Sequence, residues 1–223
     1  MNLIQEIKFL VAKDLLLELR QRYALHGMML YIVSTVFVCY MSFRFSNGEI
    51  HPITWNTLFW IIMLFTAVNA IAKSFVQEGK GRLLYYYTLV SPQAVIVSKI
   101  LYNALLMLVL SIVGLSVYSL IIGNPVQDMA LFVLNVLLGG IGFSSSFTMI
   151  SAIASKANNG GTLMAILGFP VILPMLIMLI KISKNAMDGL ALSNSYDELI
   201  TLGAINMIVV TISYLLFPYL WRT

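Results

Sequence analysis

Six stretches of about 20 mostly apolar residues take up most of this 223-residue chain. A helix of that length crosses the hydrocarbon core of a bilayer, where the backbone must satisfy its own hydrogen bonds. Charged residues make up only 10% of the chain, whereas a soluble domain carries roughly 25%. The sequence therefore predicts an all-α integral membrane protein. We expect its six transmembrane helices at 24–45, 54–76, 95–122, 127–154, 160–181 and 199–220.

The N-terminal residues 2–22 differ from these stretches because they alternate apolar and charged side chains. The apolar residues recur at helical spacing: Leu3, Ile4, Ile7, Leu10, Val11 and Leu15. The charged residues take the other faces: Glu6, Lys8, Lys13, Asp14, Glu18, Arg20 and Arg22. This pattern is typical of an amphipathic helix that lies along a membrane surface. We therefore expect an N-terminal interfacial helix followed by a six-helix bundle over 24–220, with residues 1–223 forming a single membrane domain.

The distribution of lysine and arginine indicates the orientation. With the N-terminus in the cytoplasm, ten of the 13 lysines and arginines fall in inner segments. The other three, Arg44, Lys181 and Lys184, fall outside. This bias predicts a multi-pass protein with both termini in the cytoplasm. The same residues lie at the ends of apolar stretches, so their charge suits lipid headgroups, and we expect no nucleic acid partner.

The longest inner loop, at 77–92, is unusually rich in apolar and aromatic residues. Its candidate docking residues are Glu78, Lys80, Arg82, Leu83, Leu84, Tyr85, Tyr86 and Tyr87. Such a surface is rarely left uncovered in the cytoplasm, which favours a coupling loop that docks on a soluble partner. The alternative is an interfacial segment whose tyrosines sit among the headgroups.

The sequence shows no arrangement of residues that indicates an active site. Gly79-Lys80-Gly81 does not have the spacing of a phosphate loop, so we expect ATP to bind only to a separate subunit. Cys39 is the only cysteine, which predicts no metal site. The serines of 144–155 would need a basic partner at membrane depth to act as nucleophiles, and we expect no buried lysine there. We therefore assign no catalytic residue, and the sequence indicates no cofactor-binding residue.

The fifth stretch contains two prolines four residues apart. Pro170 and Pro174 each remove a backbone donor, so this helix should be kinked or broken. With Gly168 they are candidate hinge residues, although a simple packing kink is the alternative. No acidic, basic or histidine residue lies near the centre of any apolar stretch. Ion-coupled carriers usually need such residues, so the sequence argues against that class and favours transport driven by an energy source outside the membrane.

Three segments of the chain carry a resemblance to a known family. They are KDLLLELRQRYALHGMMLYIVSTVFVCYMSF (13–43), GRLLYYYTLVSPQAVIVSKILYN (81–103) and LMAILGFPVILPMLIMLIKISKNAMD (163–188). The chain resembles the haem exporter protein B family, the permease component of the cytochrome c maturation ABC transporter.

The resemblance implies an ABC-2-type permease-like fold in the bacterial cytoplasmic (inner) membrane. It implies a permease subunit, not an enzyme, in an ATP-driven complex that exports or delivers haem for c-type cytochrome biogenesis. The implied partners are a cytoplasmic ABC ATPase, a haem-handling membrane subunit and a second copy of this chain, with haem as possible cargo rather than a bound cofactor. The alternative is a non-conducting assembly subunit that couples the ATPase to the haem-handling protein.

Overall fold

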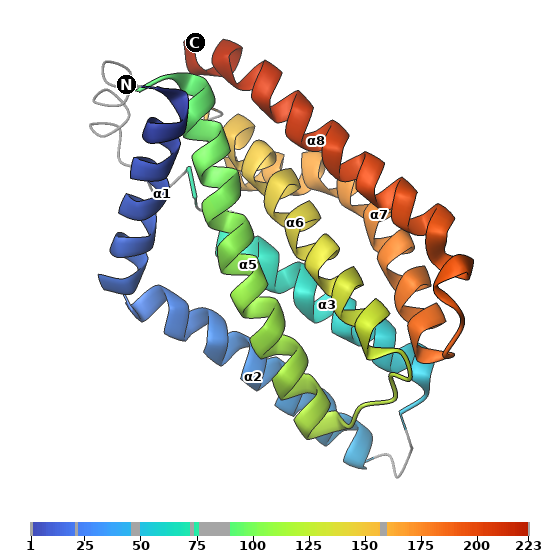
Figure 1. Ribbon diagram of the computed structural model, residues 1–223. Coiled ribbons are helices and arrows are strands. Elements are labelled where there is room, and N and C mark those ends of the chain that lie inside the picture. The colour runs from blue at the N-terminus through green and yellow to red at the C-terminus, as the bar shows by residue number, and fades with distance from the viewer. Residues whose placement is uncertain are drawn as a thin grey trace.

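The computed structural model describes residues 2–20, 22–45, 50–71, 74–75, 90–156 and 160–222, and these residues form helices without any strand. Figure 1 shows the helices in chain order. Their bounds are α1 Leu3–Arg20, α2 Arg22–Phe45, α3 Pro52–Ile71, α5 Pro92–Ile122, α6 Met129–Ala154, α7 Gly160–Met187, the short 3₁₀ helix η1 Leu192–Ser195 and α8 Tyr196–Arg222. Among the described residues, six helices are long and apolar enough to cross a membrane. The prediction of six spans is therefore confirmed.

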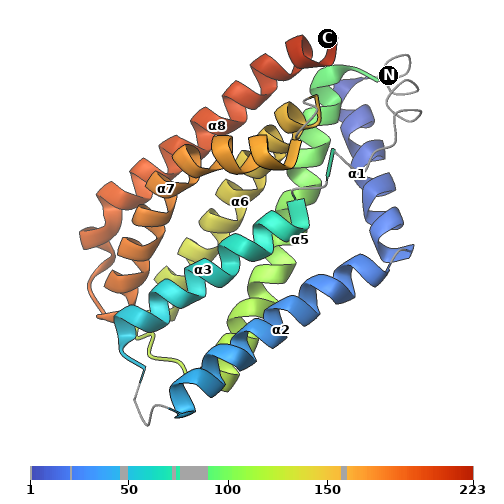
Figure 2. The same cartoon turned by 180° about the vertical axis from the view of Figure 1, so that it is seen from behind.

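Both termini lie at one end of the bundle, as Figures 1 and 2 show. We call this the terminal end, and the opposite end, where α2 ends and α3 begins, the far end. The expected spans 160–181 and 199–220 left residues 182–198 as a long loop, and this was wrong. Helix α7 continues to Met187 and α8 begins at Tyr196. Asn185, in the added turn of α7, is paired within the fold, since its amide donates to the Ser195 hydroxyl at 2.9 Å.

Aromatic side chains form the core near the far end. Trp55 and Phe59 of α3 contact Tyr118 of α5 and Phe132 of α6, with ring centroids 4.7–5.8 Å apart. The Trp55 indole N–H donates to the Gly123 carbonyl at 2.9 Å, and the Tyr118 hydroxyl donates to the Trp55 carbonyl at 2.9 Å. Buried indole and phenol groups normally need such partners. These bonds fix the turn after α5 against the start of α3.

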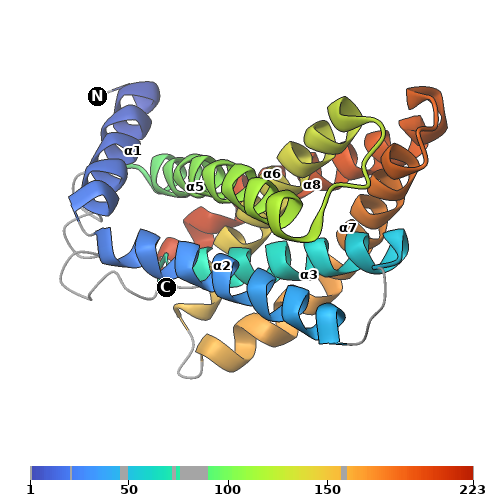
Figure 3. The ribbon, with the colours of Figure 1, turned by 90° about the horizontal axis from the view of Figure 1, so that it is seen from below.

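Helix α6 is the central helix of the bundle and packs against α3, α5, α7 and α8 (Figure 3). Its glycines permit this close approach. A Cβ atom added at Gly142 would collide with Met175 of α7 and would lie 2.5 Å from Oδ1 of Asn206 on α8. At Gly142 a small residue thus lets α6 approach α7 and α8 closely.

Adding one methyl group to α6 should destabilise the bundle. In Gly139→Ala the new Cβ would lie 2.9 Å from the Trp60 ring and 2.9 Å from Leu179, and both side chains are buried. Overpacking lowers the stability by about 1–3 kcal/mol, whereas the higher helix propensity of alanine raises it by about 1 kcal/mol at most. We expect the free energy of unfolding in detergent to fall by about 1–2 kcal/mol. Gly203→Ala is the matched control, because its Cβ would meet nothing within 4 Å, and its stability should not fall. An equal loss of stability in Gly139→Ala and Gly203→Ala would contradict the close packing of α6 at Gly139.

Candidate functional site

The docking residues expected from sequence lie outside the described residues. They are Glu78, Lys80, Arg82, Leu83, Leu84, Tyr85, Tyr86 and Tyr87. The structure does describe where the chain enters and leaves this segment, at Phe75 and Val90, both packed in an apolar cluster at the terminal end. The candidate functional site therefore consists of the helices that hold Phe75 and Val90 in place.

Helix α1 holds the last residues of the predicted docking loop. Oε2 of Glu6 accepts hydrogen bonds from the Ser91 hydroxyl at 2.7 Å and from the Ser91 backbone N–H at 3.2 Å. Ser91 is the N-cap of α5, and its own side chain makes no capping bond. These two bonds from Ser91, the hydroxyl bond first, lower the pKa of the Glu6 carboxyl. The contact therefore stabilises the fold above the ordinary glutamate pKa and is lost as the pH falls through the lowered one.

Two further contacts continue from α1 along α5. Asp14 forms an ion pair with Lys99, with Oδ2 and Nζ 3.1 Å apart. The Tyr102 hydroxyl donates to the Glu18 carboxylate at 2.9 Å. Together with the Glu6–Ser91 contact, these join residues 84 or 85 positions apart in sequence. The constant offset means that α1 and the start of α5 run in the same direction and in register, while Figure 1 shows the two helix axes at an angle to each other. We call these three contacts the α1–α5 seam.

The ion pair in the seam is buried. The Lys99 side chain is 9% exposed and that of Asp14 is 8% exposed. The expectation that no lysine is buried was therefore wrong. Lys99 falls near one end of its apolar stretch, where a lysine normally reaches water, but α1 covers it. Its partner lies on a distant segment, so neither residue stood out in the sequence.

Helix α1 presents apolar side chains away from the bundle. The exposed fractions are 66% for Ile4, 75% for Phe9, 67% for Leu16 and 63% for Leu19. Leu10 packs inward, in the same cluster as Phe217 and Trp221 of α8. The acidic residues of α1 make its contact with α5, and much of the apolar surface of α1 faces outward.

The hinge candidates lie in a bent helix. Helix α7 is continuous from Gly160 to Met187 with both prolines inside it, and Figure 2 shows that it bends along its length. Pro170 and Pro174 are exposed, whereas Gly168 is buried beside Phe147 and Ile150 of α6. The expected kink is present. Movement about these residues stays a prediction.

The part of α7 that follows the prolines is anchored by side-chain hydrogen bonds. The Trp60 indole and the Asn135 amide both donate to the Ser183 hydroxyl at 2.8 Å. Asn135 also donates to the Leu179 carbonyl at 2.8 Å, and Asn56 donates to the Ile180 carbonyl at 2.9 Å. Helices α3 and α6 thus hold this half of α7. These asparagines were not predicted as anchors from the sequence; for Asn56, the available signal was a polar side chain at the start of an apolar stretch.

The comparison with known families decides the identity. A family model described as CcmB protein matches residues 5–220, nearly the whole chain. The chain belongs to the CcmB family. A search of curated proteins returned no match. CcmB proteins are a membrane component of the haem export system for cytochrome c maturation, in a multi-subunit ABC-type complex of the bacterial inner membrane. The resemblance seen in the sequence is therefore confirmed, and the CcmB match includes the α1–α5 seam, the predicted docking loop and α7.

The described residues of this CcmB chain offer no obvious metal site. No three His, Cys, Asp or Glu side chains gather there in a way that could hold a metal ion. The polar groups that do gather, in the seam and around Ser183, join helices to one another. Their chemistry suits holding the helices of the bundle together.

Proposed function

We propose that this chain is the permease subunit of an ATP-driven complex that exports or delivers haem across the cytoplasmic membrane for c-type cytochrome biogenesis. The observation that carries this proposal is membership of the CcmB family over residues 5–220. A separate cytoplasmic ATPase would bind and hydrolyse ATP and dock on the loop at 77–92. The chain itself would bind no cofactor, and haem would be cargo of the complex.

The proposed orientation places the terminal end in the cytoplasm. The ten-to-three distribution of lysine and arginine supports it. Helix α1 would then lie along the inner surface, with Ile4, Phe9 and Leu16 in the acyl chains and its acidic residues on α5. A haem-handling membrane subunit and a second copy of this chain would complete the complex.

The α1–α5 seam supports a route for motion from the ATPase into the membrane. The docking loop leads directly into Ser91 and α5, and Glu6 of α1 holds that junction. A rigid connection of this kind would let a displacement of the loop move α1 and α5 as one unit. The bend of α7 lies before the half that hydrogen bonds hold to α3 and α6, and it would allow the other helices to adjust.

Purification provides the test. The chain extracted from native membranes should bring an ATPase subunit with it. The isolated chain should neither bind nor hydrolyse ATP, because it lacks a phosphate loop. Returned to its partner, it should change that enzyme's rate of hydrolysis. Nucleotide binding by the isolated chain would refute the assignment as a subunit. An ATPase that co-purifies while haem delivery persists without this chain would refute its role in haem export.

A further inference from the structure

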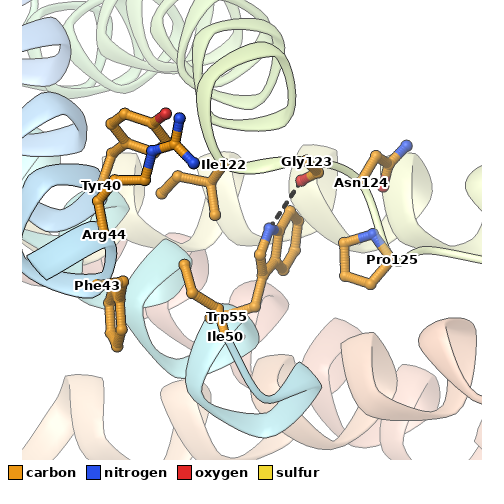
Figure 4. A pocket seen from close by; sticks show the side chains of 9 residues that line it. All are labelled: Tyr40, Phe43, Arg44, Ile50, Trp55, Ile122, Gly123, Asn124 and Pro125. Atoms are coloured by element: carbon orange, nitrogen blue, oxygen red, sulfur yellow. Dashed lines mark hydrogen bonds between the residues drawn. The ribbon is translucent and has the colours of Figure 1, made fainter. Parts of the chain in front are cut away.

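A pocket of about 430 Å³ lies at the far end of the bundle, opposite the end that holds the α1–α5 seam (Figure 4). It is formed by the end of α2, the start of α3 and the turn between α5 and α6. Its lining residues are Tyr40, Phe43, Arg44, Ile50, Trp55, Ile122, Gly123, Asn124 and Pro125. The volume is in the range of sites that hold small molecules or their headgroups.

The wall of this pocket is held in place by hydrogen bonds. Trp55 is 2% exposed, and its indole bond to the Gly123 carbonyl ties α3 to the turn after α5. The Asn124 side-chain oxygen accepts from the Val126 N–H at 3.1 Å, which shapes the same turn. The Asp128 N–H donates to the Ala186 carbonyl at 2.8 Å and joins that turn to α7. The pocket is therefore preorganised, and a ligand would not have to order it.

Arg44 is the only charged residue among those that line the pocket. Its guanidinium lies over the Tyr40 ring, 5.8 Å from the centroid, as Figure 4 shows. None of the ion pairs found among the described residues includes Arg44. Guanidinium groups bind phosphate through paired charge-assisted hydrogen bonds. The pocket thus offers an anion site beside an aromatic wall.

An apolar track leads from this pocket along α2. Leu30, Val33 and Phe37 are 68%, 41% and 51% exposed. With Tyr40 and Arg44 they follow helical spacing on one face of α2. Ten residues of helix, from Leu30 to Tyr40, rise about 15 Å, which is half of the roughly 30 Å hydrocarbon core. The track is therefore about as long as one leaflet is thick. Of the six spans, α2 also has the smallest buried share, 11%.

We propose that this pocket and track form a binding site for one membrane phospholipid. Its phosphate binds Arg44 inside the pocket, and one acyl chain lies along Leu30, Val33 and Phe37. The charge of Arg44 selects a phosphate-bearing lipid, and the length of the track selects a lipid over a free phosphate ion. The site is independent of ATP and haem, so it stands apart from the proposed transport function.

Native mass spectrometry of the purified, delipidated chain tests the headgroup contact. The probe is phosphatidylglycerol titrated in detergent, with bound lipid counted per chain. Arg44→Gln should weaken the binding of the tightest lipid at least about tenfold, because a charge-assisted contact is lost. Lys184→Gln is the matched control: it removes one exposed positive charge from α7 near the same end and should leave that binding unchanged. Equal affinity in the wild type and Arg44→Gln would overturn the proposal. Displacement of the lipid by millimolar inorganic phosphate would also overturn it and leave a phosphate-ion site.

Photolabelling of the wild-type chain tests the track without any substitution. A phospholipid with a diazirine midway along its acyl chain should label residues 30–37 of α2 first, and excess unlabelled lipid should suppress that label. Equal labelling of α2 and of the exposed face of α8, which carries Met207 and Leu215, would show ordinary bilayer contact and overturn the proposal.

Discussion

Lys99→Met should lower the free energy of unfolding by about 3 kcal/mol or more, because it leaves the Asp14 carboxylate buried without its main partner. Asp14 is 8% exposed and cannot recover its hydration in place. Lys13 also reaches Asp14, at 2.9 Å, but its side chain is 33% exposed, so it offsets only part of the loss. Thermal and denaturant unfolding of the purified chain in detergent would measure the change. Protease cleavage within α1 should rise in parallel, because the ion pair holds α1 to α5.

Two further variants test whether the loss of stability in Lys99→Met comes from the broken buried ion pair. Asp14→Leu combined with Lys99→Met should recover most of the stability, since apolar groups can replace a buried pair at little cost. Lys181→Met breaks an exposed pair with Glu198 at 3.2 Å and should cost about 1 kcal/mol or less. If Lys99→Met is as stable as Lys181→Met, then the buried pair does not hold α1.

At least one of Tyr85→Ala, Tyr86→Ala and Tyr87→Ala should abolish co-purification of the partner ATPase while the chain remains stably inserted. A docked surface concentrates its binding energy in a few aromatic side chains, each worth about 2 kcal/mol or more. Tyrosines that only contact headgroups should tolerate single replacement, because their neighbours keep the segment at the interface. The scan also includes Leu83→Ala and Leu84→Ala, with ATPase yield measured per amount of chain.

Tyr219→Ala provides the matched control for this scan. Tyr219 is a 73% exposed tyrosine near the end of α8, at the same terminal end. Its replacement should leave the ATPase yield unchanged. If all five loop variants retain the ATPase at the wild-type yield, docking occurs elsewhere, and the short segment 155–161 at the same end becomes the next candidate.

Apolar periodicity and length predicted the six spans because both act locally. An uninterrupted stretch such as that around Leu106 and Leu110 forms a transmembrane helix whatever it later packs against. The kink of α7 was predictable for the same reason, since a proline changes its own helix.

The polar contacts were not predictable, because their partners are distant in sequence. Asn56 binds a carbonyl 124 residues away, and Lys99 meets a carboxylate 85 residues earlier. The stretch 182–198 was misjudged for this reason: Ser183 and Asn185 suit a loop until Trp60 and Ser195 supply their hydrogen bonds. The docking residues at 78–87 stay a prediction from composition and resemblance.

The register of the α1–α5 seam has a consequence for how the chain is made. Each acidic residue of α1 leaves the ribosome about 85 residues before its partner on α5. At 5–20 residues per second, that delay is roughly 4–17 s. During this time the carboxylates of Asp14 and Glu18 lack their partners on α5 and remain hydrated, so α1 cannot reach its final packing before α5 enters the bilayer. The first helix to be synthesised is therefore among the last to reach its final place.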